Sequence, residues 1–122
     1  MKIRIDPLDK LFSEFIRRRA MVRVGGCERC LTPKVSYKQL QCSHFHGRSR
    51  KSVRWDEDNA VGLCYGCHQY LSSHPQEHLE WFKKHIGVSE FENLEGRMRQ
   101  RGHPDKQLLT LYYKAQLEEI ER

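Results

Sequence analysis

Apolar side chains recur at helical spacing near the amino end of the chain. Over residues 7–22 they fall three or four positions apart, at Leu8, Leu11, Phe12, Phe15 and Ile16. Pro7 suits the first turn of a helix, and Asp6 before it is a candidate N-cap. Gly25 and Gly26 follow the pattern and are typical of a helix end. The sequence therefore predicts an amino-terminal helix with one apolar face.

The middle of the chain lacks this helical period. Residues 27–67 are irregular, and short apolar runs around residues 39–42 and 61–63 predict strands. Because periodic helices do not interrupt this stretch, we expect the chemistry of the protein to lie here.

Helical periodicity returns in the carboxyl-terminal part. Residues 68–72 and 77–86 predict two helices, and Ser89 with Glu92 predicts a capping box that opens a third. A fourth helix is predicted over residues 105–121. Its apolar stripe comprises Leu108, Leu111, Tyr112, Ala115 and Leu117. Such a stripe either covers the chain's own core or pairs two copies in a homodimer.

The length of 122 residues fits one domain and not two cores of ordinary size. We expect a single domain over residues 1–122 with an α+β, mostly helical fold. Its parts are the helix over residues 7–22, a core over residues 27–73 and a helical part over residues 77–121. No apolar run reaches the roughly 18 residues of a membrane span, and the first residues do not lead into an apolar signal core. The sequence thus predicts a soluble, cytoplasmic protein without a membrane partner.

Charge points to a polyanionic partner. Lys and Arg total 22 against 16 Asp and Glu, which gives a net charge of +6, and the isoelectric point is near 9.2. Part of this charge ends the first predicted helix, where Arg17, Arg18, Arg19 and Arg23 follow one another without an acid between them. These arginines either form a solvated helix end or contact phosphates.

Cysteine spacing predicts a metal site. Two Cys-x-x-Cys pairs, Cys27 with Cys30 and Cys64 with Cys67, supply the four thiolates that tetrahedral Zn²⁺ prefers. Residues 31–63 separate the pairs, more than the roughly 15 to 20 residues usual in a simple zinc ribbon. An odd count of five cysteines in an unexported chain argues against a disulfide framework. The fifth, Cys42, is interpreted as a small buried thiol.

Three further residues extend this pattern: His44, Asn59 and His68. Residues 59–68 read Asn-Ala-Val-Gly-Leu-Cys-Tyr-Gly-Cys-His, which resembles the Asn-Leu-x-x-Leu-Cys-x-x-Cys-His pattern of the HNH endonucleases of the ββα-metal superfamily. The Ser-His-aromatic triplet at 43–45 and Arg-Trp at 54–55 are similar to the NinG (Rap) family of phage recombination endonucleases. That likeness covers about residues 8–96, and His68 stands where the family more often has Asn.

The resemblance implies a zinc-stabilised ββα-metal (HNH) core with flanking amino- and carboxyl-terminal helices. In such a core His44 ends the first strand and acts as the general base, and Asn59 holds the loop that orients it. His68, on the helix that begins near Tyr65, binds one catalytic divalent cation. The four knuckle cysteines hold a structural Zn²⁺ remote from the reaction. The implied activity is metal-dependent hydrolysis of phosphodiester bonds in branched or single-stranded-containing DNA.

One position departs from the family. HNH enzymes commonly place Asp before the general base as a second metal ligand, and this chain has Ser43, whose hydroxyl is a weaker ligand for a hard cation. Ser43 is retained as a candidate ligand beside His46, Asp56, Asp58 and water. The change favours Mn²⁺ or another transition metal over Mg²⁺. It also keeps open an alternative function, a non-catalytic zinc-binding nucleic-acid-binding module.

The loop after His44 carries the predicted DNA contacts. Four basic residues lie in a stretch without an acid: Arg48, Arg50, Lys51 and Arg54. They either form a solvated loop or, beside a phosphodiesterase centre, contact the DNA backbone. The remaining histidines have no counterpart in the family pattern and are interpreted as surface residues: His74, His78, His85 and His103.

Overall fold

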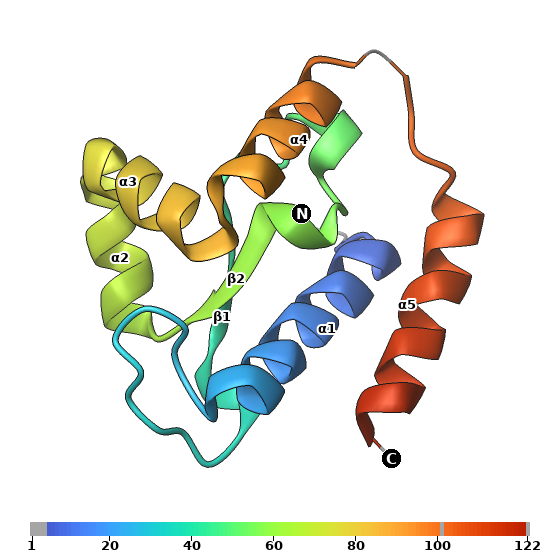
Figure 1. Ribbon diagram of the computed structural model, residues 1–122. Coiled ribbons are helices and arrows are strands. Elements are labelled where there is room, and N and C mark those ends of the chain that lie inside the picture. The colour runs from blue at the N-terminus through green and yellow to red at the C-terminus, as the bar shows by residue number, and fades with distance from the viewer. Residues whose placement is uncertain (1–4, 101, 122) are drawn as a thin grey trace, which may run out of the picture.

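The structure is a computed structural model that describes residues 5–100 and 102–121, and it is mostly helical with one small sheet (Figure 1). This is the α+β class that the sequence predicts. The helices are α1 (Pro7–Val24), α2 (Tyr65–Ser73), α3 (Pro75–Ile86), α4 (Val88–Arg99) and α5 (Lys106–Glu121). The strands are β1 (Gln41–His44) and β2 (Ala60–Leu63). In the described residues no helix is both long and apolar enough to cross a bilayer.

Helix α1 begins and ends as the sequence predicts. The Asp6 carboxylate accepts a hydrogen bond from the Leu8 N–H at 2.8 Å, which caps the first turn. Gly25 adopts the left-handed conformation with φ of 68° and closes the last turn through its N–H to Met21. The helix is longer than predicted by two residues at its carboxyl end.

The two strands pair antiparallel, with Gln41 opposite Leu63 and His44 opposite Ala60. Helix α1 crosses one face of this sheet closely. A Cβ atom at Gly62 would lie only 2.6 Å from the Cβ of Ala20, so a side chain there would push the helix away. Glycine at position 62 therefore lets α1 pack directly on the hairpin.

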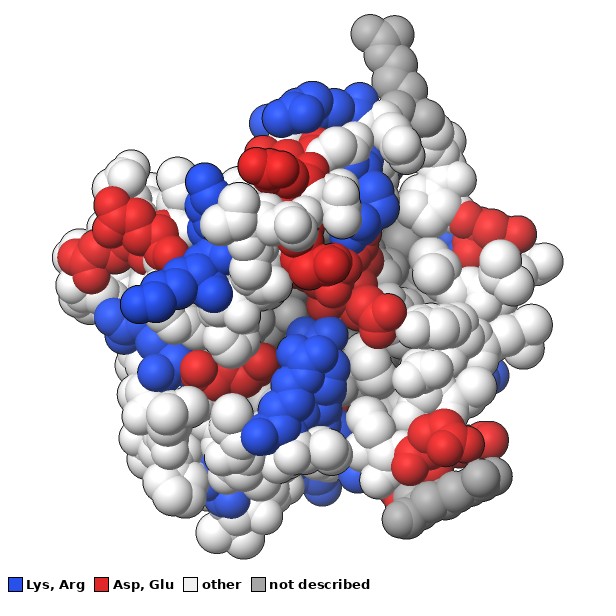
Figure 2. All heavy atoms as spheres, in the orientation of Figure 1, with Lys and Arg blue, Asp and Glu red and all other residues white. Residues whose placement is uncertain are grey.

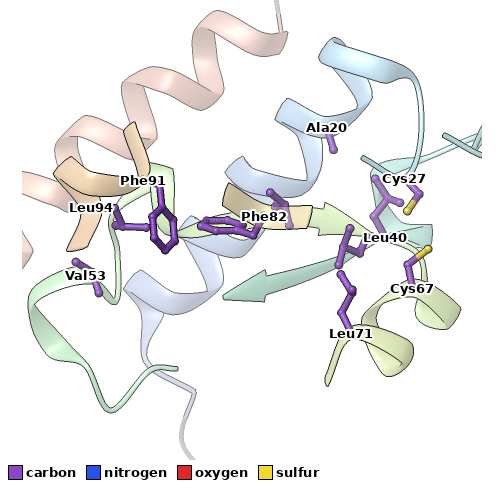
Figure 3. Close-up of a cluster of buried hydrophobic side chains, with 11 residues drawn as sticks. Ala20, Cys27, Leu40, Val53, Cys67, Leu71, Phe82, Phe91 and Leu94 are labelled. Atoms are coloured by element: carbon purple, nitrogen blue, oxygen red, sulfur yellow. The ribbon is translucent and has the colours of Figure 1, made fainter. Parts of the chain in front are cut away.

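Two apolar clusters form the core, one on each side of the sheet, because successive strand residues face opposite sides. Val61 and Leu63 belong to a cluster with α2, α3 and α4, in which Phe45 stacks on Phe82 with ring centres 4.5 Å apart (Figure 3). Ala60 belongs to the other cluster, which joins α1 to α5.

Two local predictions in the carboxyl-terminal part are wrong. Helix α4 starts at Val88 with Gly87 as its N-cap, so Ser89 already lies inside the helix and forms no capping box with Glu92. In α5 the buried residues are Tyr113 and Leu117. Most of the predicted stripe instead faces solvent, with exposed fractions of 63% for Leu108 and 67% for Leu111.

The phase of α5 is set by α1. The ring of Tyr113 meets the ring of Phe12 edge to face at 5.2 Å, and its hydroxyl donates to the backbone carbonyl of Trp55. A large aromatic ring that also finds a buried acceptor fixes the helix rotation more strongly than the smaller apolar residues beside it. The prediction of a homodimer through the exposed stripe stays a prediction.

Candidate functional site

The four knuckle cysteines converge at the end of the sheet where β2 meets α2. We call Cys27, Cys30, Cys64 and Cys67 the cysteine cluster; their sulfur atoms all lie within 4.8 Å of one another. The sulfurs of Cys30 and Cys64 are 3.8 Å apart. Four Zn–S bonds of about 2.3 Å in a tetrahedron place the sulfurs about 3.8 Å apart. The cluster therefore fits structural zinc.

Local backbone geometry presents these sulfurs. The Leu31 N–H donates to the Cys27 carbonyl at 2.9 Å, and this closes the turn of the first pair. In the second pair the Cys64 sulfur accepts the Cys67 N–H at 3.4 Å as the N-cap of α2. Because N–H groups aimed at sulfur stabilise a thiolate, both turns are suited to metal ligation.

The thiols differ in their ionisation. Hydrogen bonding to Thr32 lowers the pKa of Cys30 to about 6. Burial raises the pKa of Cys27 and raises that of Cys67 to about 12. A buried thiol ionises readily only beside a cation, so metal binding and loss of these protons are coupled.

A buried carboxylate fastens the first knuckle to the rest of the fold. Glu28 accepts the Gly62 N–H at 2.6 Å and lies 3.1 Å from Nε2 of His85. Burial alone would raise the pKa of Glu28, but the hydrogen bonds from His85 and Gly62 outweigh it and lower the pKa. His85 thus connects α3 to the knuckle and is not the plain surface residue that the sequence suggested.

A pocket of about 420 Å³ lies between α1, the end of β1 and α2. Its lining residues are Asp9, Ser13, Cys42, His44, Gly47, Arg48 and His68. We call it the histidine pocket, because it brings together His44 and His68, which are far apart in the sequence. Both were singled out from the sequence.

Hydrogen bonding fixes the tautomer of His44. Its Nε2 lies 3.2 Å from the backbone carbonyl of Arg54; a carbonyl only accepts, so Nε2 carries the proton and Nδ1 keeps its lone pair. Burial lowers the pKa of His44 below its ordinary 6.5. The ring packs 5.5 Å from that of Phe12. His44 is therefore a neutral, oriented imidazole at neutral pH.

His68 is oriented in the same way by a different partner. Its Nδ1 donates to the side-chain oxygen of Gln41 at 2.6 Å, which leaves Nε2 with the lone pair. Among the described residues, Nε2 of His68 has no hydrogen-bond partner. Burial lowers the pKa of His68. A neutral imidazole whose second nitrogen is held by an acceptor is the usual form of a metal-binding histidine.

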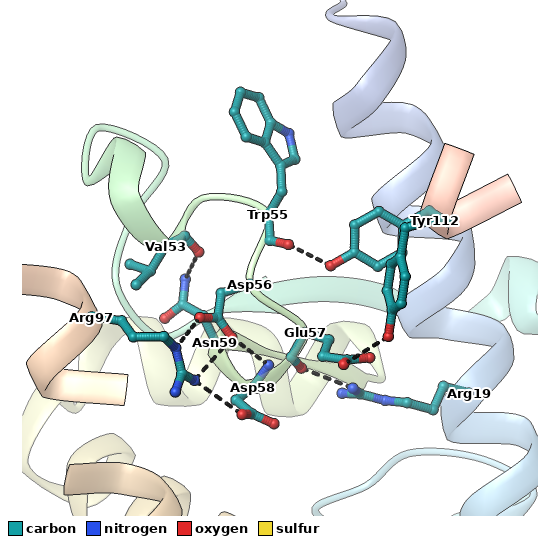
Figure 4. A network of polar contacts seen from close by, with 10 residues as sticks. Arg19, Val53, Trp55, Asp56, Glu57, Asp58, Asn59, Arg97 and Tyr112 are labelled. Carbon is teal, nitrogen blue, oxygen red and sulfur yellow. Dashed lines mark hydrogen bonds and ion pairs between the residues drawn. The ribbon is translucent and has the colours of Figure 1, made fainter. Parts of the chain in front are cut away.

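Asn59 closes the loop between the strands. The residue is fully buried, and its amide donates to the carbonyls of His46 at 3.0 Å and Val53 at 3.1 Å (Figure 4). Its side-chain oxygen accepts the His46 N–H at 2.9 Å. The backbone N–H of Phe45 also donates to the Asn59 carbonyl. Asn59 therefore fixes the chain directly after His44.

The candidate second metal ligands do not reach the histidine pocket. Ser43 is 2% exposed and pairs with Val61, on the face of β1 opposite to that of His44. His46 is hydrogen-bonded to Glu95. Asp56 and Asp58 lie across the loop.

Those two carboxylates are ion-paired with Arg97 on α4 (Figure 4). Within residues 5–100 and 102–121, the cysteine cluster is the only group of three or more metal-ligating side chains that lie close enough to share an ion. Water would complete the coordination of a cation at His68.

The predicted DNA contacts separate into two groups. Arg48, Arg50 and Lys51 are exposed. Arg54 instead binds Asp9 of α1, with its Nε 3.0 Å from Oδ1, and this pair lies beside the indole of Trp55. Its charge is engaged inside the protein and is not available to phosphate. Figure 2 shows basic and acidic side chains interleaved on this face, without a continuous basic patch.

Sequence reasoning missed three residues that organise the two sites. Asp9 holds the segment whose carbonyl orients His44, Gln41 orients His68, and Glu28 fastens the knuckle. All three act on partners far away in the sequence, so no local motif marks them. Cys42 does line the histidine pocket, but burial raises the pKa of its thiol to about 12, in agreement with a structural role.

Comparison with known proteins identifies no relative: no family model, no curated protein and no solved structure matches this chain.

Proposed function

We propose that the protein is a metal-dependent DNA endonuclease of the HNH type. One observation carries the proposal: two neutral histidines line one pocket, and each ring is fixed by an acceptor on one nitrogen and keeps a lone pair on the other. The order β1, β2, α2 around them is compatible with the ββα arrangement that the sequence resemblance implies.

His44 would act as the general base. Its Nδ1 takes a proton from a water molecule, and the resulting hydroxide forms a bond to the phosphorus of a phosphodiester. The bond from phosphorus to the 3′ oxygen then breaks, and that oxygen takes a proton from solvent. The Arg54 carbonyl stabilises the imidazolium that forms, because it accepts the proton on Nε2.

His68 would hold a divalent cation through Nε2. A cation bound there supplies charge neutralisation at the scissile phosphate and at the leaving oxygen. A single imidazole with water ligands favours Mn²⁺ or another transition metal over Mg²⁺. The cysteine cluster adjoins the Leu63 end of the sheet and His44 lies at the other end, a separation of roughly 10 Å along a strand. Zinc in the cluster would therefore stabilise the fold without taking part in the reaction.

The substrate class follows from charge and from the resemblance to the NinG (Rap) family. Exposed cations next to the pocket read phosphates and not bases, so they favour recognition of DNA shape. We infer branched or single-stranded-containing DNA, as in recombination intermediates.

A second candidate is a zinc module that binds nucleic acid without cutting it. It is favoured by the absence, in the described parts of the chain, of a second group of three metal-ligating side chains beside the cysteine cluster. This alternative predicts DNA affinity without nicking.

A panel of DNA substrates tests the proposal. Linear duplex, single strand, flap, D-loop and four-way junction are incubated with the protein, with and without Mg²⁺ or Mn²⁺. We expect metal-dependent nicking that prefers the branched or single-stranded substrates and is absent in His44→Ala. Equal cleavage of all five would indicate a general nuclease, and binding without cleavage under every metal would favour the zinc module.

A further inference from the structure

The arginines that end α1 are not equivalent in the structure. Arg19 is turned inward and donates to the carbonyls of Glu57 and Ala60, both at 2.8 Å. Arg18 pairs with Glu14 at 3.2 Å and with Glu121 at 3.5 Å. Both are therefore used within the fold, and neither is free to bind an external anion.

Arg17 is held differently. Its Nε donates to the carbonyl and the hydroxyl of Ser13, at 3.2 and 3.1 Å, and its guanidinium lies 5.1 Å from the centre of the Tyr37 ring. It has no acidic partner among the described residues, and its two terminal nitrogens have no hydrogen-bond partner there. Arg17 is thus a positioned cation with free donors.

Its position relates it to the histidine pocket. Asp9 and Ser13 line the pocket one helical turn apart, and Arg17 follows them by one more turn on the same face of α1. The charge of Arg17 also acts on the thiol of Cys42, another lining residue. Arg17 therefore lies at one end of the pocket.

Arg48 lies at the other end. It lines the pocket and is 61% exposed, and its only ion pair among the described residues is a long one, 3.6 Å to Asp9. Asp9 already binds Arg54 more closely. An exposed pair of this length contributes little, so Arg48 can exchange it for a phosphate.

We propose that Arg17 and Arg48 form a pair of phosphate-binding residues that hold one DNA strand across the histidine pocket, parallel to α1. The eight-residue step from Asp9 to Arg17 spans about 12 Å of helix, which matches roughly three to four nucleotides of one strand. A strand bound at both ends would pass over His44 and His68. The inference rests on the proposed function and adds the path and the contacts of the substrate.

DNA binding measured without cleavage tests this pair. Fluorescence anisotropy with a labelled single strand and a labelled four-way junction, without added divalent cation, gives Kd at several salt concentrations. We expect Arg17→Gln and Arg48→Gln each to lower the slope of log Kd against log salt by about 0.7 to 0.9, and the double variant by about twice that. Arg18→Gln, the matched neighbour on α1, should leave the slope unchanged.

A charge-retaining variant separates folding from binding. Arg17→Lys keeps the cation but loses the hydrogen bonds to Ser13, and we expect a slope close to that of the wild type. If Arg17→Gln binds with the same slope as Arg18→Gln, the pair is wrong even though the protein still cuts DNA. If the pair behaves as expected and no metal supports cleavage, the nuclease function is wrong and the binding pair stands. A wild-type protein that binds neither DNA overturns both.

Discussion

The cysteine cluster and the histidine pocket adjoin opposite ends of one two-stranded sheet, and they are built in different ways. The cluster has four ligands of one kind within 4.8 Å, all from two short motifs. The pocket draws its lining from α1, β1, the following loop and α2, and it holds two histidines without a third metal-ligating neighbour.

This difference separates a site that stabilises from a site suited to reaction. A closed set of four thiolates satisfies zinc completely and leaves no position for substrate. A pocket with one imidazole for a metal and one for a proton leaves open coordination positions and room for a phosphate. In this comparison stability belongs to the cluster and proposed catalysis to the pocket, and each can be broken separately.

The largest expected effect is loss of the cysteine cluster. Cys64→Ser, or removal of zinc with a chelator, should abolish cooperative unfolding, because zinc-coupled folding is worth about 10 to 16 kcal/mol in zinc-finger peptides and a whole domain has about 5 to 15. Elemental analysis should find about one zinc per folded chain. Circular dichroism and a thermal melt measure the loss of structure.

Cys42→Ala is the matched control, since this cysteine lies outside the cluster. It should keep the zinc content and shift the melting temperature only slightly. Folded wild-type protein without zinc would remove the stabilising role of the cluster.

The next largest effect is removal of the proposed base. His44→Ala should lower cleavage by about 10²- to 10⁴-fold while zinc content and the thermal melt stay near wild type. His68→Ala should also be inactive, but excess Mn²⁺ should restore part of its activity because the loss is in cation affinity. Cleavage by His44→Ala at the native rate would exclude the proposed mechanism.

The pH dependence sharpens the same site. Burial lowers the pKa of His44 and of His68 below 6.5, so both are neutral at pH 7 and charge only as the pH falls below that value. Protonation opposes the buried, folded forms, so the stability linked to these groups is present above pH 6.5 and is lost as the pH falls through the lowered values.

Cleavage should therefore be constant above neutrality with respect to these groups and fall toward acid. A higher metal concentration should displace the contribution of His68 to lower pH, because metal and proton compete for Nε2, and should leave that of His44 in place. A rate that rises toward acid would contradict His44 as the base.

The smallest effect concerns Asp9, which acts on His44 through another residue. Asp9→Asn keeps the shape but loses the charge that holds Arg54, whose carbonyl orients the imidazole. We expect kcat to fall by about ten- to a hundredfold with little change in KM, because misplacement of a reacting group by about 1 Å costs up to this much.

Glu14→Gln is the control on the same helix, since Glu14 pairs with Arg18 away from the pocket. It should leave kcat unchanged. Equal effects of the two variants would assign Asp9 a purely structural role.

Local signals in the sequence were sufficient for the elements and for the cysteine cluster. The cap at Asp6, the end at Gly25 and the two Cys-x-x-Cys spacings depend on neighbours within a few residues, and the structure agrees with each. The rotation of α5 could not be predicted, since it depends on the contact of Tyr113 with Phe12. Ser89 failed as a cap because the αα junction at Gly87 starts the helix earlier.

By itself, then, the sequence determined the fold class, the zinc-ligand set and the two histidines, because these follow from spacing along one chain. Only the tertiary structure decided which lone pair each histidine keeps, through Gln41 and the Arg54 carbonyl. It also decided which arginines are free, since Arg17 and Arg19 differ by two positions on α1 and yet face different surroundings. Burial and hydrogen bonding arise from contacts between distant segments, and these contacts convert a pattern of residue types into a site with defined chemistry.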